Sequence, residues 1–318
     1  MTAKEEGGHA MSCPDKKRTH GESGPGAGIE MAAVIKTVGI ISRPRRDEAV
    51  AVVPQLVQWL EAHKIAVYHD AETSAAGSKQ RERPREELPG LADVLIVLGG
   101  DGTLLAAARM LGDREVPILP VNLGGLGFLT SVQLAELYPI LEQVVAGESR
   151  ISERTLLEAE LIRDGKRIER QRALNDAVIN KGALTRIIDM DLHIDGGYVC
   201  SYKADGLILS TPTGSTAYSL SAGGPIIYPA VEAFVVTPIC PHSLTNRPLV
   251  IPDTVRVEVE TRGSEEPAFL TLDGQIGYEL KAGDRVAVTK APKKLRLVRP
   301  ARRTYFEILR NKLKWGER

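Results

Sequence analysis

The sequence predicts an α/β domain built on a parallel sheet, followed by an all-β, sandwich-like domain. Strand-like and helix-like patterns alternate up to about residue 150, which is typical of a parallel sheet with crossover helices. Beyond that point, short β-branched runs are separated by hairpin turns such as Asp164-Gly165, Asp195-Gly196 and Asp273-Gly274. Helical spacing returns from Thr304 to Trp315, so we expect this C-terminal helix to pack back on the first domain.

The first domain follows from apolar periodicity. In chain order we expect a strand at 34–41, a helix at 47–63, a strand at 65–68, a charged loop at 71–90, a strand at 95–98, a helix at 104–111 and a strand at 116–121. A capping box at Thr130–Gln133 then predicts the start of a further helix, which ends near Gly147. The expected domain boundaries are 1–32 for a disordered tail, 33–148 plus 301–318 for the α/β domain, and 149–300 for the β-rich domain.

The composition excludes several classes of protein. Lys plus Arg and Asp plus Glu both number 41, so nothing in the net charge favours nucleic acid or an anionic membrane as a partner. We see no apolar stretch that would span a bilayer and no signal peptide, so we expect a cytoplasmic protein. Cys13, Cys200 and Cys240 are too widely spaced for a disulfide framework, and we interpret them as reduced thiols. Cys240 lies near His242, but a structural role is favoured over metal binding.

An acidic residue among glycines is the most informative feature. The apolar run 95–98 ends in Gly99-Gly100-Asp101-Gly102-Thr103, and a helix follows at once. A glycine turn at a helix N-terminus offers backbone N–H groups to phosphate, which makes Gly99, Gly100, Gly102 and Thr103 the predicted phosphate loop. Asp101 would repel phosphate, so we predict that it accepts a proton from a substrate hydroxyl. The alternative is a tight turn in which Asp101 or Thr103 caps the helix.

Two further stretches point to a ribose-bearing ligand. Asn122–Phe128 is again rich in glycine and follows the next strand, so both glycine turns should line one sheet edge. Residues 205–225 are dense in Gly, Ser and Thr, which suit ribose and phosphate oxygens, and Tyr218 suits a flat base. A plain loop and a surface Ser/Thr loop are the alternatives for these two stretches.

Together these motifs resemble the NAD kinases of bacterial type. The glycine loop alone also resembles the wider superfamily that includes diacylglycerol kinases. The Asn122–Phe128 stretch, Asn175-Asp176, the run 211–218 and the run 241–249 narrow the resemblance to NAD kinases. It implies a kinase that uses ATP to phosphorylate the 2′-hydroxyl of the adenosine ribose of NAD, giving NADP and ADP, at a site between the two domains. A lipid kinase of the same superfamily and a non-catalytic dinucleotide sensor are the alternatives.

The resemblance also implies particular site residues. Asp101 is the expected proton acceptor. The expected NAD contacts are Asp101, Gly102, Asn175, Asp176, Arg186, Lys203, Asp205, Thr213, Thr216, Ala217, Tyr218, Ser219, Leu220, Ser221 and Gln275. NAD and ATP are the expected partners, and Mg²⁺ is expected to accompany ATP as the cofactor. The resemblance also implies a homo-oligomer (dimer or tetramer) and a cytoplasmic role in NADP biosynthesis.

Overall fold

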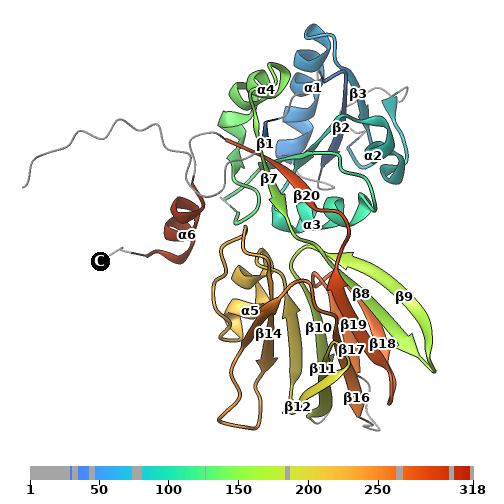
Figure 1. Cartoon of the computed structure of the whole chain (residues 1–318). Helices are drawn as coiled ribbons and strands as arrows, with labels where there is room; N and C mark the ends of the chain where they lie inside the picture. Colours follow the sequence, from blue (N-terminus) through green and yellow to red (C-terminus); the bar gives the residue numbers. More distant parts are fainter. Residues whose placement is uncertain are drawn as a thin grey trace, which may run out of the picture.

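A computed structural model describes residues 29–30, 35–42, 47–73, 81–125, 127–182, 187–262, 268–300 and 304–315. Figure 1 shows a mixed α/β domain above a domain of β-sheets, as the sequence predicts. The first domain is built on an 8-stranded sheet of order β1-β7-β20-β5-β4-β2-β3, with β6 paired to β5. Strands β2, β3, β4 and β5 are mutually parallel, and their carboxyl ends therefore share one edge of the sheet.

The helices cover both faces of this sheet, so its central strand β4 is buried along its whole length. Helices α1 and α4 belong to one apolar core cluster, whereas α2 and α3 belong to another. The elements are β1 Ile29–Glu30, β2 Thr37–Ser42, α1 Asp47–Ala62, β3 Ala66–His69, a 3₁₀ helix Arg85–Glu87, α2 Leu88–Leu91, β4 Val94–Leu98, α3 Asp101–Met110, β5 Ile118–Asn122, β6 Val132–Gln133, a 3₁₀ helix Leu134–Glu136, α4 Leu137–Val145, β7 Arg150–Arg154, β20 Leu295–Arg299 and α6 Tyr305–Leu313.

Three local expectations differ from the structure. The capping box is formed by Gln133 and Glu136, not by Thr130–Gln133, because residues 132–133 pair with β5 as a strand before the helix begins. The expected loop at 71–90 contains a 3₁₀ helix and α2 among its described residues. Ile29–Glu30 pairs with β7 instead of belonging to a disordered tail, and the rest of 1–32 lies outside the described residues.

The second domain consists of two antiparallel six-stranded sheets, of order β15-β14-β13-β10-β17-β18 and β12-β11-β16-β19-β8-β9. One apolar core cluster takes residues from both sheets, which explains the alternating burial along strands such as β16 and β17. Its elements are β8 Leu157–Arg163, β9 Lys166–Ala173, β10 Asp176–Lys181, β11 Ile188–Ile194, β12 Gly197–Ala204, β13 Gly206–Ser210, a 3₁₀ helix Gly214–Thr216, α5 Tyr218–Ser221, β14 Ala233–Ile239, β15 Leu249–Pro252, β16 Val257–Arg262, β17 Ala268–Leu272, β18 Ile276–Leu280 and β19 Arg285–Lys290.

The predicted hairpin turns are confirmed by their backbone angles. Both residues of Asp164-Gly165, Asp195-Gly196 and Asp273-Gly274 have positive φ, between 49° and 78°. For Asp164-Gly165 and Asp195-Gly196 this is the conformation of a two-residue type I′ turn, which Asp followed by Gly tolerates best. Asp273-Gly274 belongs to a three-residue connection, because Leu272 pairs with Ile276. These dipeptides therefore fix the register of the hairpins β8–β9, β11–β12 and β17–β18.

The chain crosses between the domains twice, on strands β7 and β20. The sequence analysis places both strands in the second domain, but they are antiparallel neighbours in the sheet of the first, with Arg154 opposite Leu295. The whole second domain is therefore inserted between two adjacent strands of the first. Helix α6 contacts both domains: Tyr305 packs edge-on against Tyr228, and Lys312 lies 5.9 Å from the centre of the Phe128 ring.

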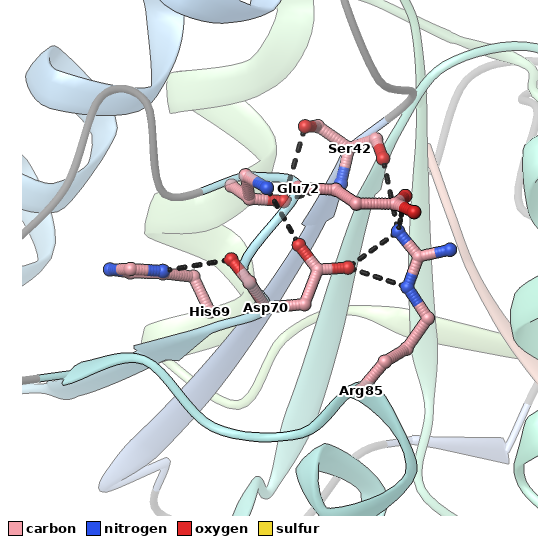
Figure 2. A network of polar contacts seen from close by, with 6 residues as sticks. Ser42, His69, Asp70, Glu72 and Arg85 are labelled. Carbon is pink, nitrogen blue, oxygen red and sulfur yellow. Dashed lines mark hydrogen bonds and ion pairs between the residues drawn. The ribbon is translucent and has the colours of Figure 1, made fainter. Parts of the chain in front are cut away.

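A network of hydrogen bonds and ion pairs connects the carboxyl ends of β2 and β3 (Figure 2). Asp70 is only 2% exposed, and its carboxylate accepts a hydrogen bond from Arg85 Nε at 2.5 Å and from the Thr73 N–H at 2.8 Å. Arg85 also reaches Glu72 at 2.6 Å, and the Ser42 N–H donates to Thr73 Oγ1. The arginine pairs with both carboxylates, so the buried Asp70 is not left without a countercharge.

Candidate active site

The glycine turn after β4 leads directly into helix α3. The N-cap is Gly100, with extended backbone and no side-chain cap, so neither Asp101 nor Thr103 caps the helix as the alternative interpretation expected. The first-turn N–H groups of α3 are thus free of a side-chain acceptor. Gly99 and Thr103 are exceptions to the predicted phosphate loop, because the Gly99 N–H donates to Val121 O at 2.9 Å and the Thr103 N–H donates to Gly100 O at 3.0 Å.

The carboxylate of Asp101 is held by four hydrogen bonds from one loop. Oδ2 accepts the Phe128 N–H at 2.9 Å, whereas Oδ1 accepts the Leu129 N–H at 3.3 Å, the Thr130 N–H at 2.9 Å and the Thr130 hydroxyl at 2.8 Å. A carboxylate oxygen has two lone pairs, so Oδ1 is fully used and Oδ2 retains one acceptor position. The structure therefore fixes the orientation of Asp101 and leaves it a single free acceptor.

The second glycine stretch shapes the loop whose residues 128–130 donate to Asp101. Asn122 Oδ1 accepts the Gly124 N–H at 2.7 Å, and its Nδ2 donates to Gly125 O and to Thr130 Oγ1, both at 2.8 Å. A Cβ on Gly127 would lie 2.2 Å from Asp101 Oδ1, so only glycine fits there. The sequence motif locates this loop, but the local pattern predicts a helix cap at Thr130 and indicates no role for the Asn122 side chain.

Two motifs of the second domain pack together beside the glycine loop. Thr211 N–H donates to Asn175 O at 2.9 Å, and Thr211 Oγ1 donates to Leu174 O at 2.5 Å. A Cβ on Gly214 would lie 2.1 Å from Asn175 O, so the glycine permits this close backbone contact. The structure thus brings Asn175-Asp176 and the run 211–218 into one unit, as a shared ligand site requires.

Two buried carboxyl groups lie behind this unit. Asp273, which the sequence analysis treated only as a turn residue, accepts the N–H groups of Leu174 at 3.0 Å and Asn175 at 2.7 Å. Burial, and then the nearby charge of Asp273, raise the pKa of Asp176 to about 7. Burial also raises the pKa of Asp273, although the backbone N–H donors and Arg109 act in the opposite direction. Asp176 is therefore a carboxyl group whose charge changes near neutral pH.

The domains meet at the Asp101 loop through Gln275. Its Nε2 donates to Gly102 O at 2.8 Å, and its Oε1 accepts a hydrogen bond from Arg109 Nη2 at 3.1 Å. Both polar groups of the side chain are therefore used between the domains. The structure gives Gln275 a bridging role, and a direct NAD contact would compete with these two bonds.

The other expected NAD contacts have contrasting environments. Thr213 Oγ1 is buried and has no hydrogen-bond partner within the described chain, so it can bond a ligand. The Tyr218 side chain is exposed, as a base-packing ring must be. The hydroxyl of fully buried Ser219 bonds Thr237 Oγ1 at 2.9 Å, so this hydroxyl already has a partner within the protein, and the NAD contact of Ser219 stays a prediction.

The remaining expected contacts are placed as follows. Thr216, Ala217 and Leu220 are half-buried around α5, and Ser221 is exposed. Lys203 is exposed 3.8 Å from Asp189, and Asp205 forms an ion pair with Lys181 at 2.8 Å. Arg186 lies outside the described residues. No cluster of three His, Cys, Asp or Glu side chains that could hold a metal occurs in the part of the chain that is described, and Cys200 and Cys240 are free thiols.

Comparison with known proteins decides the family. The ATP-NAD kinase N-terminal domain matches residues 38–149, and the ATP-NAD kinase C-terminal domain matches residues 174–300. The chain belongs to the NAD kinase family. A NAD kinase of Solibacter usitatus is 53% identical over 285 residues, which cover 90% of this chain and 99% of that protein. A NAD kinase of Geobacter sulfurreducens is 50% identical over 285 residues, covering 89% and 100%.

Solved structures agree with this assignment. Yeast NADH kinase in complex with NADH matches with a TM-score of 0.82 and 28% identity, over 90% of this chain and 89% of the yeast chain. An NAD kinase from Archaeoglobus fulgidus in complex with ATP has the same fold, with a TM-score of 0.70 and 24% identity over 87% and 98% of the two chains. NAD kinase activity is thus supported over the lipid-kinase and sensor alternatives. Within the described residues, no helix has the length and apolar character needed to cross a bilayer.

Proposed function

We propose that this NAD kinase transfers the γ-phosphoryl group of ATP to the 2′-hydroxyl of the adenosine ribose of NAD, with Asp101 as the proton acceptor. The observation that carries this proposal is the single free acceptor position on Asp101 Oδ2, at the loop where the two domains meet. A carboxylate with one free lone pair at a fixed place orients one hydroxyl, which is what regiospecific phosphorylation of a ribose needs.

The reaction itself is an in-line displacement at phosphorus. The 2′-oxygen forms a bond to the γ-phosphorus, the bond from that phosphorus to the bridging oxygen breaks, and ADP leaves. The proton of the hydroxyl passes to Asp101 Oδ2 as the new bond forms. The transition state spreads negative charge over the phosphoryl oxygens, so the protein contributes alignment and charge stabilisation. The first-turn N–H groups of α3 beside Gly100 and Gly102 are suited to this charge.

The dinucleotide is proposed to lie along the second-domain unit described above. Asn175 and Asp176 would hold ribose hydroxyls, the unpartnered Thr213 hydroxyl would take a further polar contact, and the exposed Tyr218 ring would pack on a base. The NADH bound by the yeast relative supports a dinucleotide site in this fold. Lys203, Asp205 and Arg186 stay proposed contacts on the resemblance alone.

Mg²⁺ is proposed to reach the site with ATP. Such ions commonly keep several waters and bind mainly to substrate phosphates, so the ion would be carried by the donor. Bound there, it would balance the phosphate charge. The homo-oligomeric state and the cytoplasmic location stay predictions of the resemblance.

Replacing Asp101 with Asn tests the proposed base. Asp101→Asn keeps the shape of the side chain but removes the proton acceptor, so kcat for NADP formation from NAD and ATP should fall by about 10²–10⁴-fold. The Kd for NAD, measured by calorimetry, should change little. Asp164→Asn, at an exposed hairpin turn of the second domain, is the matched control and should keep normal turnover. Near-normal kcat in Asp101→Asn would rule out the assignment.

A further inference from the structure

We infer that Thr130 is a positioning residue for the reaction, because its hydroxyl fixes which oxygen of Asp101 meets the substrate. The inference rests on the proposed role of Asp101 as the proton acceptor. Thr130 is 0% exposed, and its Oγ1 donates to Asp101 Oδ1 at 2.8 Å. It lies 29 residues beyond Asp101 in the sequence and comes from the loop after the neighbouring strand β5.

The direction of this hydrogen bond is fixed by Asn122. Asn122 Oδ1 accepts the Gly124 N–H, so the opposite side of the amide must be Nδ2, which only donates. Nδ2 donates to Thr130 Oγ1 at 2.8 Å. The threonine hydroxyl has a single hydrogen, and with one lone pair taken by Asn122 that hydrogen points to Asp101. The relay therefore runs one way, from Asn122 through Thr130 to the carboxylate.

The consequence of the relay is a carboxylate with unequal oxygens. With the hydroxyl in place, the acceptor positions of Oδ1 are full, and the substrate hydroxyl can bond only to Oδ2. Without it, Oδ1 keeps one short hydrogen bond, from the N–H of residue 130 at 2.9 Å, and the longer Leu129 N–H contact at 3.3 Å. A substrate hydroxyl could then compete with that long contact for Oδ1, so it would have two places to bind. A ribose hydroxyl that is bound at the wrong oxygen is not aligned with the incoming phosphoryl group.

The fold itself depends less on this hydroxyl. If it is removed, Asn122 Nδ2 keeps its bond to Gly125 O at 2.8 Å, and the N–H of residue 130 still donates to Asp101. The second Nδ2 hydrogen loses its short acceptor but still has the carbonyl oxygen of residue 130 at 3.4 Å, so the loss should affect catalysis more than stability.

The test compares Thr130→Val, which removes the hydroxyl at constant shape, with Thr130→Ser, which retains it. For Thr130→Val, kcat should fall about 10- to 100-fold, while KM and calorimetric Kd for NAD stay within about 3-fold. Thr130→Ser should recover kcat to within about 3-fold of the wild type. The control is Thr261→Val in β16, a buried threonine whose hydroxyl donates to Lys281 O at 3.0 Å away from the site, and its kcat should not change.

The same substitution in an Asp101→Asn background separates this inference from the proposed function. There, Thr130→Val should cause no further loss of kcat, because the carboxylate it orients is absent. If Asp101→Asn alone is fully active, the proposed base is wrong. If Asp101→Asn is impaired but Thr130→Val turns over normally, or Thr130→Ser is as impaired as Thr130→Val, only the positioning role is overturned. Should Thr130→Val fail to fold by circular dichroism, Thr130→Ala replaces it with the same expectations.

Discussion

At the scale of single residues, the site contains two aspartates in contrasting surroundings. Asp101 is held by N–H and O–H donors from one loop. Asp176 is 4% exposed, accepts no side-chain hydrogen bond within the described residues, and faces the charge of Asp273. The donors keep the first carboxylate in one place, whereas the second changes its charge near neutral pH. Ligand binding is therefore expected to depend on pH through Asp176.

The raised pKa of Asp176 predicts a cost to folding stability that grows with pH. Its pKa rises from the ordinary value of 3.8 to about 7 in the folded protein, so its contribution to stability is fully present below about pH 4 and is lost as the pH rises to about 7. Asp176→Asn removes the cost and should raise the free energy of unfolding at pH 8 by about 2–4 kcal/mol. Urea denaturation at pH 5 and pH 8 measures it. A gain that is equal at both pH values would contradict the assignment.

Sequence reasoning found Asp101 because one acid among glycines is a local pattern. It missed Thr130 because the two residues meet only through the pairing of β4 with β5. A Ser or Thr three residues before Gln is also a strong local signal for a helix cap, and this signal favoured the wrong partner for Thr130. Local chemistry is thus readable in the chain, whereas contacts made by sheet neighbours need the fold.

At the scale of elements, predictions succeeded where the local pattern alone decides the structure. The strand β4 follows from an unbroken apolar run, and the hairpins follow from Asp-Gly turns. Strands β7 and β20 were assigned to the wrong domain because each is short and carries arginines, so neither resembles a strand at the centre of a sheet. They belong to the first sheet because they pair with each other and with its strands, and no local sequence pattern indicates this long-range pairing.

Helix α6 gives a prediction at this scale. Thr304 caps it, with its Oγ1 accepting the Glu307 N–H at 3.3 Å and Glu307 Oε2 accepting the Thr304 N–H at 2.7 Å. Thr304→Ala should lower the free energy of unfolding by about 1 kcal/mol, and Thr304→Ser should restore most of it. Urea denaturation measures both variants. No difference between Ala and Ser would show that the capping hydroxyl contributes nothing.

At the scale of the whole molecule, the two domains meet beside the Asp101 loop through Gln275. Gln275 bonds both Gly102, next to the proposed base, and Arg109, on the same helix. The relative position of the proposed NAD-binding unit and the proposed base is therefore expected to depend in part on this side chain, together with the Arg172 contacts to Gly112 and Asp113. The sequence predicts both domains and a site between them, but not the side chain that aligns them.

Gln275→Leu should loosen this alignment. Two hydrogen bonds of about 0.5–1.5 kcal/mol each are lost, so the KM for NAD should rise about 5- to 10-fold, while the Tm changes by less than about 3 °C. Steady-state kinetics and thermal denaturation measure the two effects. Gln55→Leu, on the exposed face of α1, is the control. An unchanged KM would mean that the domains are aligned by other contacts.

The insertion of the second domain between β7 and β20 also sets the order in which the protein is completed during synthesis. Strand β20 lies between β7 and β5 in the first sheet, yet it is the last strand that the ribosome makes. The second domain is contiguous and complete by Lys290, before β20 emerges. The N-terminal domain, although begun first, closes its sheet only afterwards, so the Ile118 end of β5 stays unpaired on that edge until then, whereas Val121 and Asn122 already pair with β6. A chain released before residue 295 would thus hold a finished second domain on an open first one.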